Sequence, residues 1–569
     1  MNNAFPEATT NALKTLIPAS VAVMVVLLTL LIGSIMGTLA AVTVFAFSIA
    51  GALGLAGYIG YALTPASASA PIIILTVAVA NCVHLLVNFF LGVRYGLDKD
   101  AALEESLRIN LQPVFIASIT TAIGFLSLNF SEVPPFQQLG NIVAIGVLIS
   151  FFLAVAILPA LIAILPISAP IQRKDDGHLM VRLGDFVIRR RKPLLWIMSL
   201  IVLALLANLP RNELNDVFLR WFNQSIQFRT DTDFAIENLT GLYRIEYSLR
   251  SGESDGISNP EFLNELDEFS NWMRQQTGIR HVRTFTDIMK RLNKNLHRDL
   301  ASQYRLPNER DLAAQYLLLY EMSLPYRLAL NNEVNVDKSS VRVTVTLDAL
   351  SNNKILEFSE QSATWLTLNA PHVDALPASR TAVMFASISS RNIRAMLFGT
   401  SVALALISFI LIVAFRSLKI SSLSLIPNLL PAAMGFGLWG IFVGEVGLSL
   451  SIVMSMTPGI VIDDTVHFLS KYLRARREQN LNSADAVRYA FRTVGQALLV
   501  TSIILIAGFG VLTLSNFASN STMGILTAII IALAIFADFF LLPPLLIKVE
   551  HADNDDPSIK VGTIAVQSQ

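Results

Sequence analysis

The sequence predicts a polytopic α-helical membrane protein that carries one α+β domain outside the membrane. Composition is the first indication, because 53% of the 569 residues are hydrophobic and only 15% are charged, whereas soluble globular proteins carry about 25% charged residues. Long apolar runs recur towards both ends of the chain, and each can cross about 30 Å of hydrocarbon. Residues 210–391 contain no such run. These observations exclude a wholly soluble protein.

Eleven predominantly apolar runs are long enough to form membrane-spanning helices. Five lie in the first part of the chain, one follows alone, and five lie in the last part. Their approximate bounds are 17–36, 38–63, 71–91, 113–128, 139–165, 193–209, 396–415, 420–443, 448–469, 494–514 and 523–546.

The polar segment between the sixth and seventh runs has the pattern of a mixed domain. Residues 243–249 and 341–347 alternate apolar and polar side chains, as half-buried strands do. Residues 260–276 and 309–322 have the spacing of amphipathic helices. The chain is expected to divide into a stub outside the cytoplasm (1–16), a first five-helix repeat (17–165), a basic cytoplasmic linker (166–192), a single span (193–209), the α+β domain (210–391), a second five-helix repeat (392–547) and a cytoplasmic tail (548–569).

The distribution of Lys and Arg predicts the orientation. Alternate connections near 64–70, 131–138, 444–447 and 515–521 contain neither residue, whereas the other connections are basic. Because basic loops remain on the cytoplasmic side, the domain at 210–391 is expected on the opposite side. Lys14 then lies on the face that otherwise lacks basic residues. We therefore expect a further span and soluble domain upstream of Met1. The basic connections contain Arg94, Lys99, Arg108, Arg173, Lys174, Arg182, Arg189, Arg190, Arg191, Lys192, Arg416, Lys419, Lys471, Arg474, Arg476, Arg477, Arg488 and Arg492.

The two apolar parts of the chain form an internal repeat at an offset of about 380 to 384 residues. The segment NCVHLL at 81–86 matches DTVHFL at 464–469, and IGF at 123–125 matches AGF at 507–509. Both parts have five spans in the same order and orientation. The sequence therefore predicts two parallel repeats related by a pseudo-twofold axis along the membrane normal, an arrangement known from transporters.

Two adjacent acids inside an apolar run are the strongest functional signal. Asp463 and Asp464 interrupt the run at 448–469. A carboxylate at this depth is costly and usually faces a polar interior, and two neighbouring carboxylates titrate in coupled steps. His467 falls on the same helical face. We predict that Asp463, Asp464 and His467 form a proton relay. The alternative is that the acids lie near the cytoplasmic helix end, where they are solvated or paired with Arg474.

The motif GIVIDDTVHFL at 459–469, followed by a basic amphipathic stretch at 471–491, resembles the proton-relay helix of resistance-nodulation-division (RND) superfamily permeases. It is most similar to that of the MMPL-type predicted exporters, which are related to sterol-sensing-domain proteins. The resemblance implies a porter-like domain at 210–391, hydrophobic or lipid-like substrates, proton-driven export and a place in the inner (plasma) membrane. It also implies an earlier span and porter domain that this chain lacks.

The resemblance further implies that the relay acids face polar residues on neighbouring helices. In the first repeat, Ala80 and Asn81 stand where the second has its two acids, and His84 matches His467. Asp538, ahead of the LLP segment at 541–543, resembles an acid in the last span of the family, and it is either a titrating group or a structural acceptor. The candidate relay partners are Asn81, His84, Thr501, Ser502 and Asp538.

Several classes of function lack support in the sequence. No phosphate-binding G-x-x-x-x-G-K-[ST] loop and no G-x-S-x-G elbow occur, so we expect no enzyme. His281, His297 and His372 lack metal-ligand spacing, and we expect no metal and no cofactor. Lys plus Arg and Asp plus Glu number 42 each, which argues against a nucleic-acid partner. The single cysteine, Cys82, excludes an internal disulfide.

The expected partners are therefore a hydrophobic or amphipathic substrate, protons and the membrane. A homo-oligomer and coupling to sodium in place of protons both stay open. Two other functions also stay open: a sterol-sensing-like regulator that binds lipid without transport, and an accessory subunit for protein export. An N-terminally truncated, inactive chain is a further possibility.

Overall fold

The computed structural model describes residues 3–166, 178–241, 243–325, 330–348 and 350–554. Within these residues, eleven helical segments are long and apolar enough to cross a membrane. The prediction of a polytopic helical membrane protein is confirmed. Part of the expected basic linker (167–177) and most of the expected tail (555–569) lie outside the described residues.

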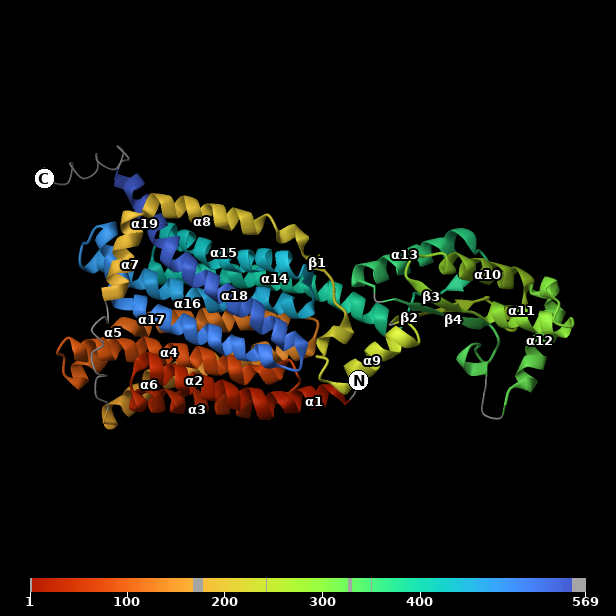
Figure 1. Cartoon of the computed structure of the whole chain (residues 1–569), viewed down its shortest axis with the longest axis horizontal. Helices are drawn as coiled ribbons and strands as arrows, with labels where there is room; N and C mark the ends of the chain where they lie inside the picture. Colours follow the sequence, from red (N-terminus) through yellow and green to blue (C-terminus); the bar gives the residue numbers. More distant parts are fainter. Residues whose placement is uncertain (1–2, 167–177, 242, 326–329, 349, 555–569) are drawn as a thin grey trace. The chain divides into compact units, whose positions relative to one another are not determined.

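The chain forms two compact units. The membrane unit comprises Met1–Glu213, Trp221–Asn223 and Asn392–Gln569, and the second unit comprises Leu214–Arg220 and Gln224–Arg391. In Figure 1 the helices of the membrane unit run side by side as a bundle. The helices with membrane spans and their short neighbours are α1 (Ala4–Asn11), α2 (Ile17–Ile32), α3 (Ile35–Ile59), α4 (Ala70–Arg94), α5 (Lys99–Leu126), α6 (Pro134–Ile164), α7 (His178–Arg189), α8 (Arg191–Leu206), α14 (Thr381–Phe415), α15 (Leu418–Phe442), α16 (Leu448–Glu478), α17 (Ser483–Val511), α18 (Ala518–Phe540) and α19 (Leu542–Asn554).

Several helices extend beyond the apolar runs in the sequence. The Asp98 and Asn482 side chains cap the starts of α5 and α17, each accepting a hydrogen bond from a backbone N–H of the first turn. Helix α16 continues to Glu478, through charged residues that an apolar search rejects. The chain is also helical from Ala4, where α1 and a π-helical turn at Ala12–Leu16 lead into α2.

The two repeats correspond element by element. Both ends of α3 and α15 are offset by 383 residues, and the starts of α5 and α17 are offset by 384. Their packing also corresponds: a Cβ built at Gly140 of α6 would lie 2.3 Å from the Phe125 carbonyl oxygen, and one at Gly524 of α18 would lie 2.6 Å from that of Phe509. Only glycine allows such close backbone approach. The predicted parallel repeat is therefore present in the structure.

Helices α4 and α16 form the centre of the membrane unit. In each, 94% of the most apolar stretch is buried, compared with 11–67% in the other spans. Helix α4 packs against α17 of the other repeat, and α16 packs against α5. Gly124 of α5 and Gly459 of α16 allow their backbones to approach within about van der Waals contact. Residues on α4 and α16 are thus brought together from the two repeats.

The second unit is an α+β domain, as the sequence predicts. Its sheet has the order β3–β4–β2–β5, and all neighbouring strands are antiparallel. Inward side chains of β2, including Tyr247 and Leu249, share an apolar core with Phe262 and Phe269 of α10. The elements of this unit are β2 (Tyr243–Arg250), β3 (Ile279–Arg283), β4 (Ser340–Leu347), β5 (Asp374–Ala375), α9 (Gln227–Asn238), α10 (Pro260–Arg274), α11 (Phe285–Leu296), α12 (Arg310–Ser323) and α13 (Asn352–Asn369). Elsewhere the chain has two two-residue strands, β1 (Glu213–Leu214) and β6 (Glu445–Val446).

Candidate functional site

The two acids predicted from the sequence lie inside the membrane unit. Asp463 is 8% exposed and Asp464 is 4% exposed, although both belong to a helix that ends in charged residues. Arg474, their alternative partner, instead binds Glu478 of the next helical turn at 2.8 Å. The acids are therefore surrounded by protein and do not form the predicted alternative pair.

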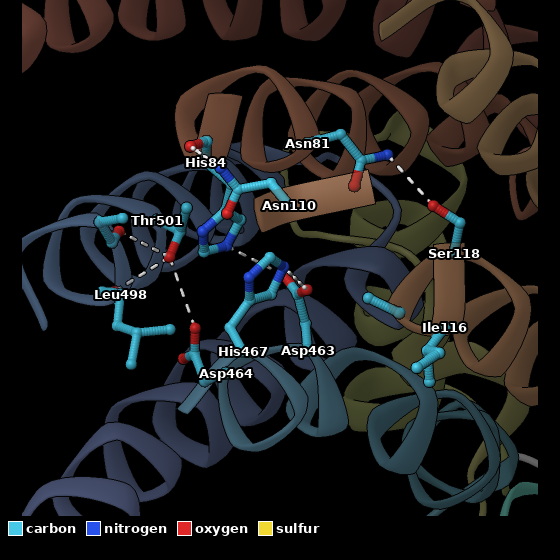
Figure 2. A network of polar contacts seen from close by, with 12 residues as sticks. Asn81, His84, Asn110, Ile116, Ser118, Asp463, Asp464, His467, Leu498 and Thr501 are labelled. Atoms are coloured by element: carbon cyan, nitrogen blue, oxygen red, sulfur yellow. Dashed lines mark hydrogen bonds and ion pairs between the residues drawn. The ribbon is translucent and has the colours of Figure 1, made fainter. Parts of the chain in front are cut away.

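Asp463 faces two histidines, one from each repeat. Its Oδ1 lies 3.5 Å from Nε2 of His467, and its Oδ2 lies 3.9 Å from Nε2 of His84. The two imidazole rings are stacked, with centroids 3.5 Å apart and planes at 6°. Figure 2 shows the two histidine side chains next to each other. Both histidines are fully buried, and none of their ring nitrogens has a hydrogen-bond partner among the described residues. A cavity of about 10 Å³, which has room for at most one water molecule, is lined by Asp463 and Asn81.

This group has the donor atoms of a metal site but not its geometry. The donors of His84, Asp463 and His467 lie within 4.8 Å of one another. A metal ion needs ligands that converge on it at about 2.0–2.2 Å. The lone pairs of an imidazole lie in its ring plane, and those of two parallel stacked rings do not converge. The arrangement suits proton exchange with a carboxyl group better than coordination.

Asp464 points in a different direction from α16, towards α17. Ser502 donates a hydrogen bond of 2.8 Å to its Oδ2, and Thr501 approaches its Oδ1 at 3.4 Å. Thr501 also donates to the carbonyl groups of Ala497 and Leu498 in its own helix. Successive residues of a helix point about 100° apart, so the adjacent acids contact different surroundings.

The remaining predicted residues form two further contacts. Asp538 of α18 is fully buried and accepts a hydrogen bond of 2.8 Å from Thr465, the residue after Asp464. Asn81 donates to Ser118 and Ser150 within its own repeat, at 3.4 and 3.2 Å. The structure therefore brings together Asp463 with the two histidines and Asp464 with the two hydroxyls, but it directs the Asn81 amide away from them (Figure 2).

Lys471 is a polar core residue that the sequence analysis places wrongly among the loop cations. It is 2% exposed, and its Nζ donates to the Ile109 carbonyl at 2.5 Å and to Asn110 Oδ1 at 3.4 Å. A signal for it was present in the sequence, because Lys471 follows Asp463 by eight residues and His467 by four, and so shares their helical face. Thr465 and Ser118 carried no comparable signal.

Two fused parallel repeats around buried ionisable residues, joined to an α+β unit, define a polytopic membrane protein of the two-repeat class. The chain belongs to the MMPL family, whose model matches residues 1–194 and 335–552. The resemblance stated from the GIVIDDTVHFL motif is therefore confirmed.

Named relatives of the chain are described as transport proteins. It is 27% identical over 208 residues to the probable transport protein MmpL10 of Mycobacterium leprae, covering 34% of this chain and 20% of that protein. It is 24% identical over 213 residues to the sulfolipid-1 exporter MmpL8 of Mycobacterium tuberculosis, covering 36% and 19%. A third match, to the probable transport protein MmpL12 of Mycobacterium tuberculosis, is 29% identical over 126 residues and covers 22% and 11%. The chain thus matches about a fifth or less of the length of these relatives.

Proposed function

We propose that this protein is a proton-driven secondary transporter of hydrophobic or lipid-like molecules in the plasma membrane, and that Asp463 and Asp464 carry the protons. Family membership and the names of the relatives support the transport class, and the sulfolipid-1 exporter supports a lipid-like substrate. The observation that carries proton coupling is the pair of buried adjacent acids, whose nearest partners are imidazoles and hydroxyls rather than Lys or Arg. Buried acids of this kind are typical of proton pathways in membrane proteins.

Each acid has a different role in this proposal. Asp463 exchanges its proton with His467 or His84, since an imidazole can accept a proton on one ring nitrogen and release one from the other. A membrane potential supplies about 2.3 kcal/mol per charge per 100 mV to such a transfer. Because His84 belongs to the first repeat and His467 to the second, the charge state of Asp463 changes the contact between the repeats. A change in the charge of Asp464 instead affects its contacts with Thr501 and Ser502 of α17.

Neutral substitutions of the acids test the proposal in proteoliposomes. We would impose a pH gradient and follow the movement of a fluorescent lysophospholipid together with proton flux, which an enclosed pH-sensitive dye reports. Asp463→Asn and Asp464→Asn should each abolish gradient-driven movement in folded protein. Glu478→Gln removes an exposed acid from the same helix, α16, and should retain it.

Two outcomes contradict the proposal. Normal movement by both Asp variants excludes the relay, and movement that persists after a protonophore collapses the gradient excludes proton drive. A lipid-binding regulator, in contrast, should bind the probe equally well in all variants without moving it.

A further inference from the structure

The buried ammonium group of Lys471 binds to a specific site in the first repeat, formed by Ile109 and Asn110 of α5, which we call its seat. Its Nζ donates to the backbone carbonyl of Ile109 in α5. In an unbroken helix that carbonyl would accept a hydrogen bond from the N–H of residue 113, but residue 113 is proline and has no N–H. Pro113 therefore leaves the Ile109 carbonyl available, and Lys471 occupies it.

The side chain of Asn110 completes the seat. Its Oδ1 faces Lys471 Nζ at 3.4 Å and accepts from Asn88 Nδ2 at 3.3 Å. Its own amide donates to the carbonyls of Ser106 and His84, at 2.9 and 3.3 Å. The seat thus connects Lys471 to the backbone of His84, whose ring stacks on His467.

The charges of the two central helices differ as a set. At the repeat offset of 383 residues, Lys471 corresponds to Asn88, Asp464 to Asn81 and Asp463 to Ala80. The histidines correspond to each other and are both retained. The repeat that has the acids therefore also has the buried cation, and the repeat that lacks the acids has a neutral amide in its place. This pattern indicates that the role of Lys471 is linked to the two acids and not to the packing of the helix.

We propose that Lys471 is a positioning residue of the proposed relay: its charge, held at the Ile109 carbonyl, opposes protonation of the stacked His84 and His467 and of Asp463, and so favours release of the proton that Asp463 carries. The inference rests on the proposed function. Asp463, His467 and Lys471 lie on one face of α16 at successive turns, so that Lys471 is about 12 Å of helix rise from the acid. The imidazoles lie between Asp463 and Lys471. The positive charge of Lys471 therefore makes protonation of an imidazole less favourable.

Other charged groups near Lys471 do not replace it. Glu105 of α5 and Arg474 of α16 interact with it electrostatically, as do the two histidines. Glu105 is bound to Arg108 at 2.7 Å, and Arg474 to Glu478. Glu105 and Arg474 are thus each already paired with an opposite charge, and the charge of Lys471 acts on the central groups.

Carbodiimide labelling tests the inference without knowledge of the substrate. Dicyclohexylcarbodiimide modifies protonated carboxyl groups in apolar surroundings, and peptide mass spectrometry of the purified full chain measures the labelled fraction of the 463–464 pair against pH. Lys471→Gln should raise labelling at pH 8 by up to about tenfold, because a unit charge about 12 Å away at an effective dielectric constant of about 20 changes a protonation equilibrium by that factor.

Lys99→Gln is the matched control. Lys99 also donates to two backbone carbonyls, those of Ala163 and Leu165, but it is partly exposed and lies at the first residue of α5. Both variants should lower thermal stability, whereas only Lys471→Gln should change the pH profile of labelling. An unchanged profile in Lys471→Gln would overturn the inference.

Pro113→Ala is a second variant, which keeps Lys471 in the chain. Alanine restores the N–H that competes for the Ile109 carbonyl, so the ammonium group should leave its seat and the labelling profile should shift in the direction seen for Lys471→Gln. An unshifted profile in a folded Pro113→Ala protein contradicts the proposed seat. If these profiles stay unchanged while Asp463→Asn and Asp464→Asn abolish transport, the inference fails and the proposed function stands. Transport by both Asp variants is the failure of the proposed function itself.

Discussion

The two repeats of the membrane unit share a scaffold but not a chemistry. The bounds of α3 and α15 coincide at an offset of 383 residues and the starts of α5 and α17 at 384, and Gly140 and Gly524 allow the same close packing. The charged residues Asp463, Asp464 and Lys471 occur in one repeat only. The comparison teaches that packing and chemistry depend on separate residues, so that a duplicated bundle can retain its shape while a single half acquires the ionisable groups.

One pair of equivalent contacts shows how this happens. In the first repeat the Asn81 amide donates to the Ser118 hydroxyl at 3.4 Å, and in the second the Thr501 hydroxyl approaches the Asp464 carboxyl at 3.4 Å. Asp464 follows Asn81 by 383 residues, and Thr501 follows Ser118 by the same number. The spacing is retained while the direction of donation reverses, because an ionised carboxylate can only accept.

Glycine substitutions give the largest expected effect and test whether the scaffold is symmetric. A Cβ at Gly140 would lie 2.3 Å from the Phe125 oxygen, and one at Gly524 would lie 2.6 Å from the Phe509 oxygen. Gly140→Ala and Gly524→Ala should each destabilise the protein by about 1–3 kcal/mol, since a backbone oxygen cannot move aside alone. Thermal unfolding in detergent measures this.

Gly54→Ala and Gly510→Ala are the controls, because a Cβ at either position meets nothing within 4 Å. They should be neutral or slightly stabilising. A large loss in one repeat and none in the other would show that the scaffold is not equivalent.

Removal of the paired hydroxyls should have a smaller effect and separates chemistry from packing. Ser118→Ala removes one long hydrogen bond, and Thr501→Val removes the long contact to Asp464 together with the bonds to Ala497 and Leu498 of its own helix. Each should cost up to about 1 kcal/mol of stability. Only Thr501→Val should alter carbodiimide labelling of the 463–464 pair, since only Thr501 faces a carboxyl group. An equal change of labelling in Ser118→Ala would break the distinction between the repeats.

Substitution of His372 should have the smallest effect. This histidine makes the stability of the α+β unit depend on pH, and that dependence must be separated from pH effects in the repeats. Its Nδ1 lies 2.6 Å from Glu265, and this hydrogen bond, followed by the charges of Glu265 and Glu261, raises the pKa of His372. The protonated histidine therefore stabilises the fold below its ordinary pKa of about 6.5, and the contribution is lost as pH rises through the raised value.

Hydrogen exchange of Pro260–Arg274 in the full chain measures this contribution. After correction for intrinsic rates, protection of the helix should be slightly higher at pH 6 than at pH 8, and His372→Gln should remove the difference. The effect should be small because the pair is exposed. Protection that is equal at both pH values in the unsubstituted protein would contradict it.

Sequence patterns predicted most of the fold because they report local properties. Apolar runs identified every span, and alternation identified β2 and β4 to within a residue. The helix ends were missed where polar turns continue a helix, as at the end of α16. The acids and His467 could be found because they interrupt an apolar run. Lys471 was assigned to a loop because a charge near the end of an apolar run has the same appearance whether it is exposed or buried.

The sequence by itself determined the number of spans, the repeat and the identity of the central acids, since hydropathy, helical period and internal similarity are properties of short segments. Only the tertiary structure decided that His84 stacks on His467, that Asp463 and Asp464 face different helices, and that Lys471 binds the carbonyl group that Pro113 leaves without its usual partner. These contacts join residues hundreds of positions apart. They depend on the rotation and register of packed helices, which the close contacts of glycines such as Gly124 and Gly459 establish only once both helices are present.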